Sequence, residues 1–577
     1  MISTGAKQTP LLKARMVVLY IGLLALAVSL IARLVFLQVL DTEHGYEFLQ
    51  HQGNARTLRT ETIPAHRGIL ADRHGTPLAV STPVESVWVN PQKLLAEVDD
   101  WSKLARAVNY EPVELQRKVS SQSHREFVYL RRRLPPDQAA SVSALELPGV
   151  YLQREYQRFY PAGEVISQLV GVTDIDDHGL EGFELAFDEW LSGTPGSKRV
   201  VKDRFGNTIR DLNMLQAERS GADVYLSIDL RLQYLAYREL KKAVLANRAT
   251  GGSIVVVDTR TGEVLALANQ PSYNPNRRRD MKPGAMRNRA ITDLYEPGST
   301  VKPFTVLAAL ENGSVSTATT IDTSPGYLNV EGKVFRDHRN YGALTLDGIL
   351  MKSSQVGITR IALAMEQNLI RDVFVRAGFG EPTNTGFPGE SIGIVPNYRR
   401  WSQVQRATFA FGYGLSATPL QLARAYTTLA SGGMRRGLSL LKLDAAPVGE
   451  RVFSADQVAV LNTMLAGVVE EAGTGTLANI AGYQVAGKTG TVQKLIASGY
   501  ADDRHVSLFA GFAPASRPRL AAVVIIDDPR AGDYGGGAVA APVFGAVVGN
   551  ALRMLNVAPD NLPELLIAQG NSSAGPV

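Results

Sequence analysis

The sequence predicts a membrane-anchored, multidomain α+β protein, and three observations lead to this prediction. An uncharged apolar run near the N-terminus is long enough to cross a bilayer. A turn-rich stretch follows it up to about residue 222. From there, strand-like runs at the start and at the end of the remaining chain enclose a mostly helical block, which is typical of a sheet covered by helices. At 577 residues the chain is expected to form several units.

The composition excludes several classes of function. Lys and Arg number 60 against 55 Asp and Glu, and a formal net charge of +5 offers no basic face of the kind that binds nucleic acid, so no nucleic-acid binding is expected. The chain has no cysteine, which excludes disulfides, thiolate metal sites and a cysteine nucleophile, and suits an oxidising compartment. No metal and no cofactor are expected.

The N-terminal segment is predicted to be a cytoplasmic tail at 1–15 and a transmembrane anchor at 16–40. Lys13 and Arg15 precede the apolar run and Asp41 follows it, so the positive-inside rule places the N-terminus in the cytoplasm and the rest of the chain outside. A cleaved signal peptide is the alternative, but the end of the run offers no convincing small-residue cleavage site.

Residues 41–222 mix short strand-like runs, charged helices and many turns, which favours a non-catalytic module over an enzyme core. Within it, residues 67–79 read as strand, turn and strand. Arg158–Gly163 and Gly179–Glu184 read as loops.

Residues 223–558 are predicted to form the main domain. The runs 252–258 and 262–267 flank a short turn and predict a hairpin. Two further strand-like runs come late, at 506–512 and 520–526, so we expect one sheet assembled from both ends of the domain. The tail at 559–577 is expected to be disordered.

Ser299 and Lys302 are the first candidate catalytic pair. They follow the Pro297-Gly298 break, at which a helix is expected to begin, so Lys302 would lie one turn above Ser299 on the same face. A serine hydroxyl needs an adjacent base to act as a nucleophile at neutral pH, and a desolvated lysine can be neutral enough to serve.

Two later motifs give this pair its context. Ser353-Ser354-Gln355 is a serine followed by an amide two residues on, and Lys488-Thr489-Gly490-Thr491 is a Lys-Thr-Gly strand. Ser-x-x-Lys, a Ser-x-amide turn and Lys-Thr-Gly, in this order, are the signature of penicillin-recognising serine enzymes.

On these motifs the chain resembles the class B penicillin-binding proteins, and among them the septal peptidoglycan transpeptidases of Gram-negative cell division. The resemblance covers nearly the whole chain, including the anchor, residues 67–75 and the segments 158–163 and 179–184. It implies an antiparallel sheet flanked by helices, with an all-helical subdomain, on an elongated N-terminal pedestal that resembles a dimerisation domain. It also implies a D,D-transpeptidase at the septum, a periplasmic catalytic domain on a single-pass anchor in the inner membrane, and covalent binding of β-lactams at Ser299.

The resemblance implies a role for each motif residue. Ser299 attacks the penultimate D-alanine of a stem peptide, Lys302 accepts its proton and Ser353 relays a proton to the leaving amine. Lys488, Thr489, Gly490 and Thr491 bind the substrate carboxylate. The backbone N–H groups of Ser299 and Thr491 form the oxyanion hole. The implied partners are stem peptides, a division glycosyltransferase and other divisome proteins.

Gln355 departs from the family pattern, which has asparagine there. Glutamine offers the same donors and acceptor on a side chain one methylene longer, which puts the acylation rate and the β-lactam affinity in doubt. The departure is consistent with a specialised paralogue.

Three alternatives stay open at this point. A β-lactamase shares two of the motifs but is shorter, and its class A form needs a Glu-x-x-Leu-Asn motif that is not found after Gln355. A catalytically weak divisome scaffold or β-lactam sensor is supported only by Gln355. An elongation-type class B enzyme is disfavoured because its pedestal is usually longer.

Overall fold

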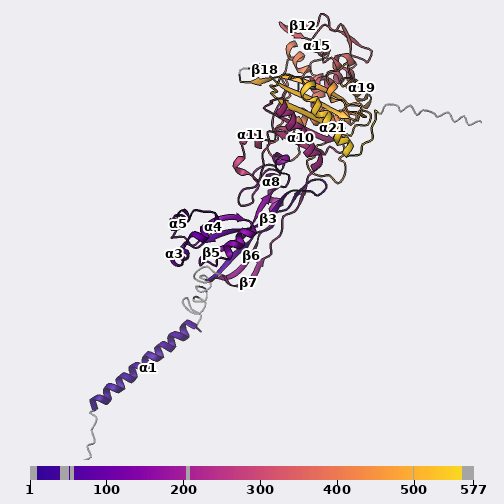
Figure 1. The fold of residues 1–577 in the computed structure, drawn as a ribbon. Coiled ribbons are helices and arrows are strands. Elements are labelled where there is room, and N and C mark those ends of the chain that lie inside the picture. The colour runs from indigo at the N-terminus through magenta and orange to yellow at the C-terminus, as the bar shows by residue number, and fades with distance from the viewer. Residues whose placement is uncertain are drawn as a thin grey trace, which may run out of the picture. The chain divides into compact units, whose positions relative to one another are not determined.

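The computed structural model describes residues 10–38, 48, 51, 57–202, 208–497 and 499–561 (Figure 1). Much of the expected cytoplasmic tail and nearly all of the expected C-terminal tail, at 1–9 and 562–577, lie outside these residues. Contacts between Cα atoms divide the described chain into two units. The first holds the described residues up to His66 together with those of Val84–Glu155 and Gly193–Ser220. The second holds Arg67–Pro83, Tyr156–Ser192 and the described residues from Gly221 onward.

The apolar N-terminal run forms one uninterrupted helix, α1 (Pro10–Gln38). Its stretch Lys13–Leu37 is long and apolar enough to cross a membrane, and the side chains of its most apolar window are exposed. Gly536–Met554 passes the same test of length and composition, but more than half of it is buried inside the protein, so it is a core helix. The structure therefore agrees with an N-terminal anchor.

The first unit combines a three-stranded sheet with a small helical core. Its sheet has the order β1-β6-β7, with β6 antiparallel to both neighbours. Trp101 and Leu104 are buried among its helices. The bounds are β1 (Leu58–Ile63), α3 (Pro91–Glu97), α4 (Ser102–Val108), α5 (Pro112–Ser120), β4 (Val128–Leu134), α6 (Pro136–Ser143), β6 (Gly196–Lys202) and β7 (Thr208–Gln216), with the first parts of β5 (Val150–Phe159) and the last part of β3 (Pro77–Val89).

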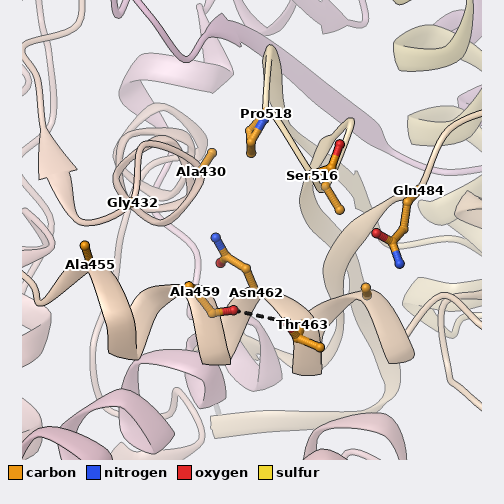
Figure 2. Close-up of a pocket in the computed structure, with 11 residues that line it drawn as sticks. Ala430, Gly432, Ala455, Ala459, Asn462, Thr463, Gln484, Ser516 and Pro518 are labelled. Atoms are coloured by element: carbon orange, nitrogen blue, oxygen red, sulfur yellow. Dashed lines mark hydrogen bonds between the residues drawn. The ribbon is translucent and has the colours of Figure 1, made fainter. Parts of the chain in front are cut away.

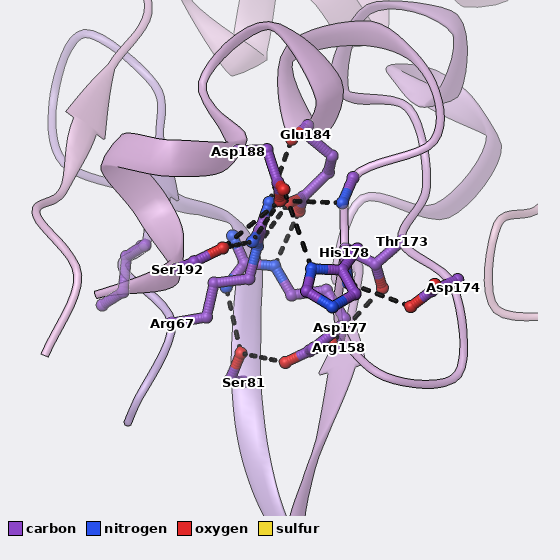
Figure 3. Close-up of polar contacts among 12 residues, drawn as sticks. Arg67, Ser81, Arg158, Thr173, Asp174, Asp177, His178, Glu184, Asp188 and Ser192 are labelled. Atoms are coloured by element: carbon purple, nitrogen blue, oxygen red, sulfur yellow. Dashed lines mark hydrogen bonds and ion pairs between the residues drawn. The ribbon is translucent and has the colours of Figure 1, made fainter. Parts of the chain in front are cut away.

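Three segments of the second unit form a buried ionic cluster, and two of them, 158–163 and 179–184, were expected to be loops (Figure 3). The carboxylate of Glu184 accepts hydrogen bonds from Arg67 Nε at 2.8 Å and Arg158 Nε at 2.6 Å, and all three residues are almost fully buried. Arg67 Nη1 also donates to Asp188 Oδ1 at 2.7 Å. Three distant segments of sequence are thus tied together within this unit.

The part of the second unit that precedes its main sheet contains β2 (Leu70–Ala71), η1 (Gly163–Val165), α7 (Ser167–Val170), α8 (Gly182–Ala186), α9 (Asp188–Ser192) and β8 (Val224–Tyr225).

The main sheet of the second unit has the antiparallel order β10-β9-β19-β18-β17, which confirms the expectation of one sheet built from both ends of the domain. The late strand β19 lies between the early strand β9 and β18, with Val524 opposite Ile254. The bounds are β9 (Gly251–Asp258), β10 (Val264–Gln270), β17 (Ala486–Ile496), β18 (Gly499–Ala513) and β19 (Leu520–Asp527).

The sheet separates two hydrophobic cores. In β9, Ile254 and Val256 pack into a core shared with α10 (Leu230–Ala246) and α21 (Ala541–Met554). The alternating residues Val255 and Val257 pack into the larger core on the opposite face. A strand buried on both faces reads as a continuous apolar run, which is why the late strands were recognisable in the sequence.

Helices are the main regular structure of the chain between the early and late strands. They are α11 (Pro283–Met286), α12 (Arg289–Thr292), α13 (Lys302–Glu311), α14 (Leu346–Met351), α15 (Gln355–Ala364), α16 (Leu369–Arg376), α17 (Gln403–Ala410), α18 (Pro419–Ala430) and α19 (Ala455–Gly467), with short 3₁₀ turns η2 (Arg278–Asp280), η3 (Gly298–Val301) and η4 (Thr476–Ala478), and α20 (Gly536–Val539) beyond the late strands.

The helical block between the early and late strands also holds two-stranded sheets. β12 (Tyr327–Val330) and β13 (Lys333–Arg336) form a hairpin whose turn residues Glu331 and Gly332 have φ of 49° and 89°. Positive φ at both turn positions is the type I′ geometry of tight hairpins. The other pairs are β11 (Thr320–Asp322) with β14 (Ala343–Thr345) and β15 (Met434–Arg435) with β16 (Glu450–Arg451).

Candidate active site

Ser299 lies on the 3₁₀ turn η3, directly before α13 begins at Lys302. The sequence predicted a helix start here, and the structure refines this, since the serine precedes the α-helix. Ser299 is half-buried, whereas Thr300 and Lys302 are fully buried. The turn is held by Thr300, whose Oγ1 donates to Pro297 O at 2.6 Å. The hydroxyl of Ser299 is therefore presented at the surface of a rigid turn.

Glycines allow this turn to approach strand β17. Gly298 has φ of +54°, and a Cβ there would lie 2.4 Å from Val492 Cγ2. A Cβ on Gly490 would lie 2.9 Å from Thr300 Cγ2. Both distances are too short for real carbon atoms, so only glycine lets the Lys-Thr-Gly strand pack against the serine turn.

Lys302 points from α13 to the loop between α14 and α15. Its Nζ donates to Ser353 O at 2.5 Å and lies 3.3 Å from both Ser353 Oγ and Ser354 O. Among the described residues the Ser299 hydroxyl has no hydrogen-bond partner, so the lysine contacts the middle motif and not the serine beside it. Ser353 has a left-handed backbone, with φ of 55°. A non-glycine residue in this region is uncommon and is often found at functional sites.

Burial lowers the pKa of Lys302 to about 7, and the carboxylate of Asp337 offsets part of the effect. A fully buried ammonium loses its hydration, which favours the neutral amine. At neutral pH this lysine is therefore able to accept a proton.

Asp337 is a site residue that sequence reasoning missed. Its Oδ2 accepts from Ser354 Oγ at 2.6 Å, and its Oδ1 accepts from the backbone N–H groups of Gln355 at 2.6 Å and Val356 at 3.1 Å. The carboxylate thus binds the first N–H groups of α15, where an anion is stabilised, and fixes the middle motif. It follows the β12–β13 hairpin and belongs to no motif, so nothing in the sequence indicated its place.

Gln355 is the first residue of α15 and is half-buried. Its backbone N–H is bound to Asp337. In the described part of the chain its side-chain amide makes no hydrogen bond. The amide is therefore available to contact a substrate.

Lys488 lies on β17 and is fully buried. Its Nζ is 3.2 Å from Thr489 O and 3.4 Å from Thr489 Oγ1. Burial lowers the pKa of Lys488 well below its usual value, and the positive charge of Lys302 adds to this shift. Two neighbouring ammonium groups disfavour each other's charge, so an anion would be attracted to this pair.

The two threonines of the third motif differ in exposure. Thr489 is buried, and its Oγ1 forms a hydrogen bond of 2.8 Å with Thr474 Oγ1. Thr491 is exposed, and its Oγ1 accepts from Gly536 N at 2.9 Å. The Thr491 hydroxyl keeps its proton free to donate to a ligand.

Glu296, three residues before Ser299, forms an unpredicted part of the surroundings. Its Oε1 accepts from Gly414 N at 2.8 Å and from Tyr500 OH at 2.9 Å, and the rings of Tyr500 and Tyr413 are in contact. Burial raises the pKa of Glu296. In the sequence, Glu296 stands directly before the Pro297-Gly298 break and was not singled out.

A hollow elsewhere in this unit is not the candidate site. It has a volume of about 390 Å³ and is lined by small residues of α18, α19 and the β18–β19 turn, among them Ala459 and Ser516 (Figure 2). None of the residues that line it belongs to the three motifs. The site is identified by its chemistry and not by cavity size.

Comparisons with known proteins agree with this geometry. The family profile of the penicillin-binding protein transpeptidase domain matches residues 252–549, and that of the penicillin-binding protein dimerisation domain matches residues 62–226. The chain is 45% identical over 563 residues to the peptidoglycan D,D-transpeptidase FtsI of Escherichia coli K12, covering 96% of this chain and 94% of the relative. It is 41% identical to the probable peptidoglycan D,D-transpeptidase PbpC of Pseudomonas aeruginosa, covering 95% and 96%.

A solved structure is similar as well. Penicillin-binding protein 3 of Mycobacterium tuberculosis, solved in complex with aztreonam, aligns with a TM-score of 0.68 at 27% identity, covering 87% of this chain and 98% of the other.

Of the two lysines and two serines that the sequence singled out, the structure joins Lys302 to Ser353 directly. It brings the Ser299 turn against the strand that carries Lys488.

Proposed function

Because the chain belongs to the class B penicillin-binding proteins, we propose that it is a serine-type peptidoglycan D,D-transpeptidase that cross-links stem peptides during septal wall synthesis. One observation carries the proposal. Ser299 lies on a rigid turn before a buried lysine whose pKa is lowered to about 7. A serine beside a base that is neutral at physiological pH is the arrangement that covalent acyl transfer needs.

In the first step, Ser299 Oγ attacks the carbonyl carbon of the penultimate D-alanine. Lys302 accepts the hydroxyl proton as the Oγ–C bond forms. The C–N bond to the terminal D-alanine then breaks, and the departing amine receives a proton through Ser353, whose Oγ lies 3.3 Å from Lys302 Nζ. The products are free D-alanine and an acyl-enzyme ester on Ser299. Neutral Lys302 is regained once its proton has passed to the leaving group.

Two negatively charged groups are bound in this proposal, the terminal carboxylate of the substrate and the oxyanion that develops during the attack. The terminal carboxylate binds to Lys488, Thr489 and Thr491, and its arrival favours the charged form of Lys488. Gly490 allows the strand to lie close enough to Ser299 for this. The developing oxyanion accepts hydrogen bonds from the backbone N–H groups of Ser299 and Thr491, and such a donor contributes roughly 3 kcal/mol in other enzymes.

In the second step, an amine of a neighbouring stem attacks the ester. Its nitrogen forms the new amide bond and its proton passes to Lys302. Lys302 then gives this proton to Ser299 Oγ as the ester C–O bond breaks, so Ser299 leaves as an alcohol and Lys302 is neutral again. A β-lactam would enter the same first step, with its ring amide as the bond that breaks. The ester would then persist on Ser299.

We place the catalytic unit in the periplasm, with α1 as a single-pass anchor in the inner membrane and the N-terminus in the cytoplasm. The support is the apolar stretch Lys13–Leu37 and the basic residues that precede it. The septal site and the partners, a division glycosyltransferase and other divisome proteins, are proposed from the similarity to relatives named FtsI.

The test is to label the full-length protein in detergent with a fluorescent penicillin and to map the adduct by mass spectrometry. The expected result is one adduct, on Ser299, that is absent from Ser299→Ala and from Lys302→Met. An adduct on another residue would overturn the assignment. Rapid release of hydrolysed penicillin would favour a β-lactamase.

Complementation separates the enzyme from a scaffold. In cells depleted of the native septal enzyme, wild-type protein should restore septation, whereas Ser299→Ala should localise and fail to do so. Septation with Ser299→Ala would favour the scaffold or sensor.

A further inference from the structure

The described chain ends at the rim of the hollow between α18, α19 and the β18–β19 turn (Figure 2). Gln484 and Ser516 line this hollow, and both bind Asp560. Asp560 Oδ1 accepts from Gln484 N at 2.8 Å, and Oδ2 accepts from Ser516 N at 3.2 Å and Ser516 Oγ at 2.6 Å. Asn561 N donates to Gly482 O at 3.2 Å. The remaining residues, 562–577, therefore start beside this opening.

Small apolar side chains make up much of the hollow's surface. In Figure 2, Gln484 and Ser516 lie at one end, and Gly432 and Ala455 lie at the other. Along the helix α19, the hollow extends over eleven residues, which corresponds to about 16 Å. Methyl groups on a helix leave room for larger side chains of a second element to pack against it. The apolar residues that line the hollow are Ala455, Ala459 and Ala466 of α19, with Ala430, Ala515 and Pro518.

One polar atom in the hollow has no partner. Asn462 lies on α19 and lines the hollow, and its Nδ2 donates to Leu429 O at 3.1 Å, which fixes the orientation of the amide. Its Oδ1 is buried and accepts no hydrogen bond from any described residue. A buried acceptor without a donor costs free energy. A segment that brings an N–H group to Asn462 Oδ1 would remove this cost.

The sequence that follows the described chain fits this opening. Leu562, Leu565 and Leu566 have the spacing i, i+3 and i+4, which is typical of the apolar face of a helix. Asn561 before them, a proline in the first turn and Glu564 three residues after Asn561 are typical of a helix start. A helix of eight residues would be about 12 Å long, which is shorter than the hollow.

The charges agree with this fit. Glu564 is the only charged side chain among residues 562–577. Arg517 is exposed on the β18–β19 turn, between Ser516 and Pro518, which both line the hollow. In the part of the chain that the structure describes, Arg517 makes no ion pair. The one anionic side chain of the segment thus has a cation at the rim, and such complementarity favours one orientation of binding.

We propose that the segment Leu562–Gln569 of this chain docks in the hollow, with its leucine side chains against the alanines of α19 and with Glu564 beside Arg517. Asn462 Oδ1 then accepts a hydrogen bond from an N–H group of the segment. Docking ties the β18–β19 turn to α19 through the chain's own C-terminal segment. Only the residues beyond Gln569 would then keep the disorder expected of the tail.

The chain's own segment is favoured over a second copy or another protein because of where it is attached. The contacts of Asp560 with Gln484 and Ser516 hold the start of the segment at the rim. A short tether gives the segment a millimolar effective concentration at the hollow, roughly, which a free partner rarely reaches.

The first test uses introduced cysteines, because the chain has none of its own. Ala459→Cys, at an exposed position of α19, is combined with Leu565→Cys in the full-length protein in detergent. Under mild oxidation a disulfide within one chain should form at least about tenfold faster than when Ala459→Cys is combined with Ala574→Cys, because docking raises the effective concentration of residue 565 alone. Digestion without reduction, followed by mass spectrometry, identifies the linked peptides.

Hydrogen exchange tests the same docking in the unaltered chain. The amides of residues 562–569 should exchange at least about tenfold more slowly than those of residues 571–577 after correction for sequence. Ala459→Arg fills the hollow and should remove this protection, whereas Leu245→Arg, at a position of α10 that is 68% exposed and outside the hollow, should keep it. Leu565→Asp should also remove it, and this variant leaves the folded domain untouched if Ala459→Arg disturbs α19.

Equal disulfide rates for the two cysteine pairs, or unprotected amides at 562–569, would overturn the proposal. A disulfide that joins two chains would make the occupant the tail of a second copy, and would overturn the assignment to the chain's own segment. Protection that survives both Ala459→Arg and Leu565→Asp would show that the segment is bound elsewhere, and would refute docking in the hollow.

Discussion

The base strength of Lys302 is open to direct measurement through the pH dependence of acylation. With a pKa of about 7, about half of the Lys302 side chains are neutral at pH 7 and about one in a hundred at pH 5. An ordinary lysine would be neutral in only about one molecule in three thousand at pH 7. If neutral Lys302 accepts the serine proton, the second-order rate of penicillin labelling should rise about fiftyfold from pH 5 to pH 7 and then level off.

A substitution tests whether this inflection belongs to Lys302. The carboxylate of Asp337 stabilises the protonated lysine and so raises its pKa. Asp337→Asn should therefore move the inflection to lower pH. Lys302→Arg, which cannot become neutral, should lose at least about a hundredfold of the rate at all pH values. Melting curves for each variant serve as the control, because Asp337 also binds the N-terminus of α15.

The assay is stopped-flow or quenched labelling with a fluorescent penicillin, under conditions where the rate is proportional to its concentration. A rate that is flat between about pH 5 and about pH 7 would refute the reasoning about Lys302. An inflection that moves to higher pH in Asp337→Asn would refute the role given to that carboxylate.

Four further outcomes are expected. Gln355→Asn should speed penicillin labelling, because the shorter amide needs less adjustment to reach the acyl group, and an unchanged or slower rate contradicts this. Gly298→Ala should lower stability by roughly 2–3 kcal/mol and slow labelling, because its Cβ would lie 2.4 Å from a valine methyl at a φ of +54°, whereas Gly284→Ala, with nothing within 4 Å of its Cβ, should change neither. Glu184→Gln should lower the free energy of unfolding by roughly 3–5 kcal/mol, because it removes the anion paired with buried Arg158 and one of the two paired with buried Arg67; a denaturant midpoint equal to that of wild type would argue against the cluster. Lys302→Met should raise the free energy of unfolding at pH 7 by roughly 2–4 kcal/mol. Since the folded pKa of about 7 lies below the unfolded value of 10.5, that gain should shrink as the pH rises from 7 towards 10.5, and a pH-independent gain would contradict it.

The sequence predicted the main sheet and the three motifs because each depends on a local pattern. The strands at 252–258 and 520–526 are apolar throughout, which marks burial on both faces. The motif residues Ser299 and Lys302 could be assigned their chemistry from residue type and order alone. Spacing could not show that Lys302 Nζ contacts Ser353, because this depends on how α13 packs against a loop about fifty residues later in the chain.

Charged residues are where sequence reasoning was weakest. Glu184 and Arg158 stand in turn-rich segments and were read as loops, since charged side chains are rarely buried unless they are paired. Their pairing with Arg67 exists only after three separate segments meet. Nothing in the sequence marked Asp337 as a site residue for the same reason. Its role depends on the N-terminus of α15, beside which the fold places its carboxylate.

The position of β19 in the middle of the main sheet has a consequence for biosynthesis. This strand pairs with β9 across about 270 residues of sequence. The sheet therefore cannot be completed until nearly the whole domain has left the ribosome. Until then β9 and β10 form a hairpin with one open apolar edge, of the kind that invites wrong pairing. A chain stopped before residue 520 should therefore aggregate or be degraded, and the emerging domain depends on whatever shields that edge during its synthesis.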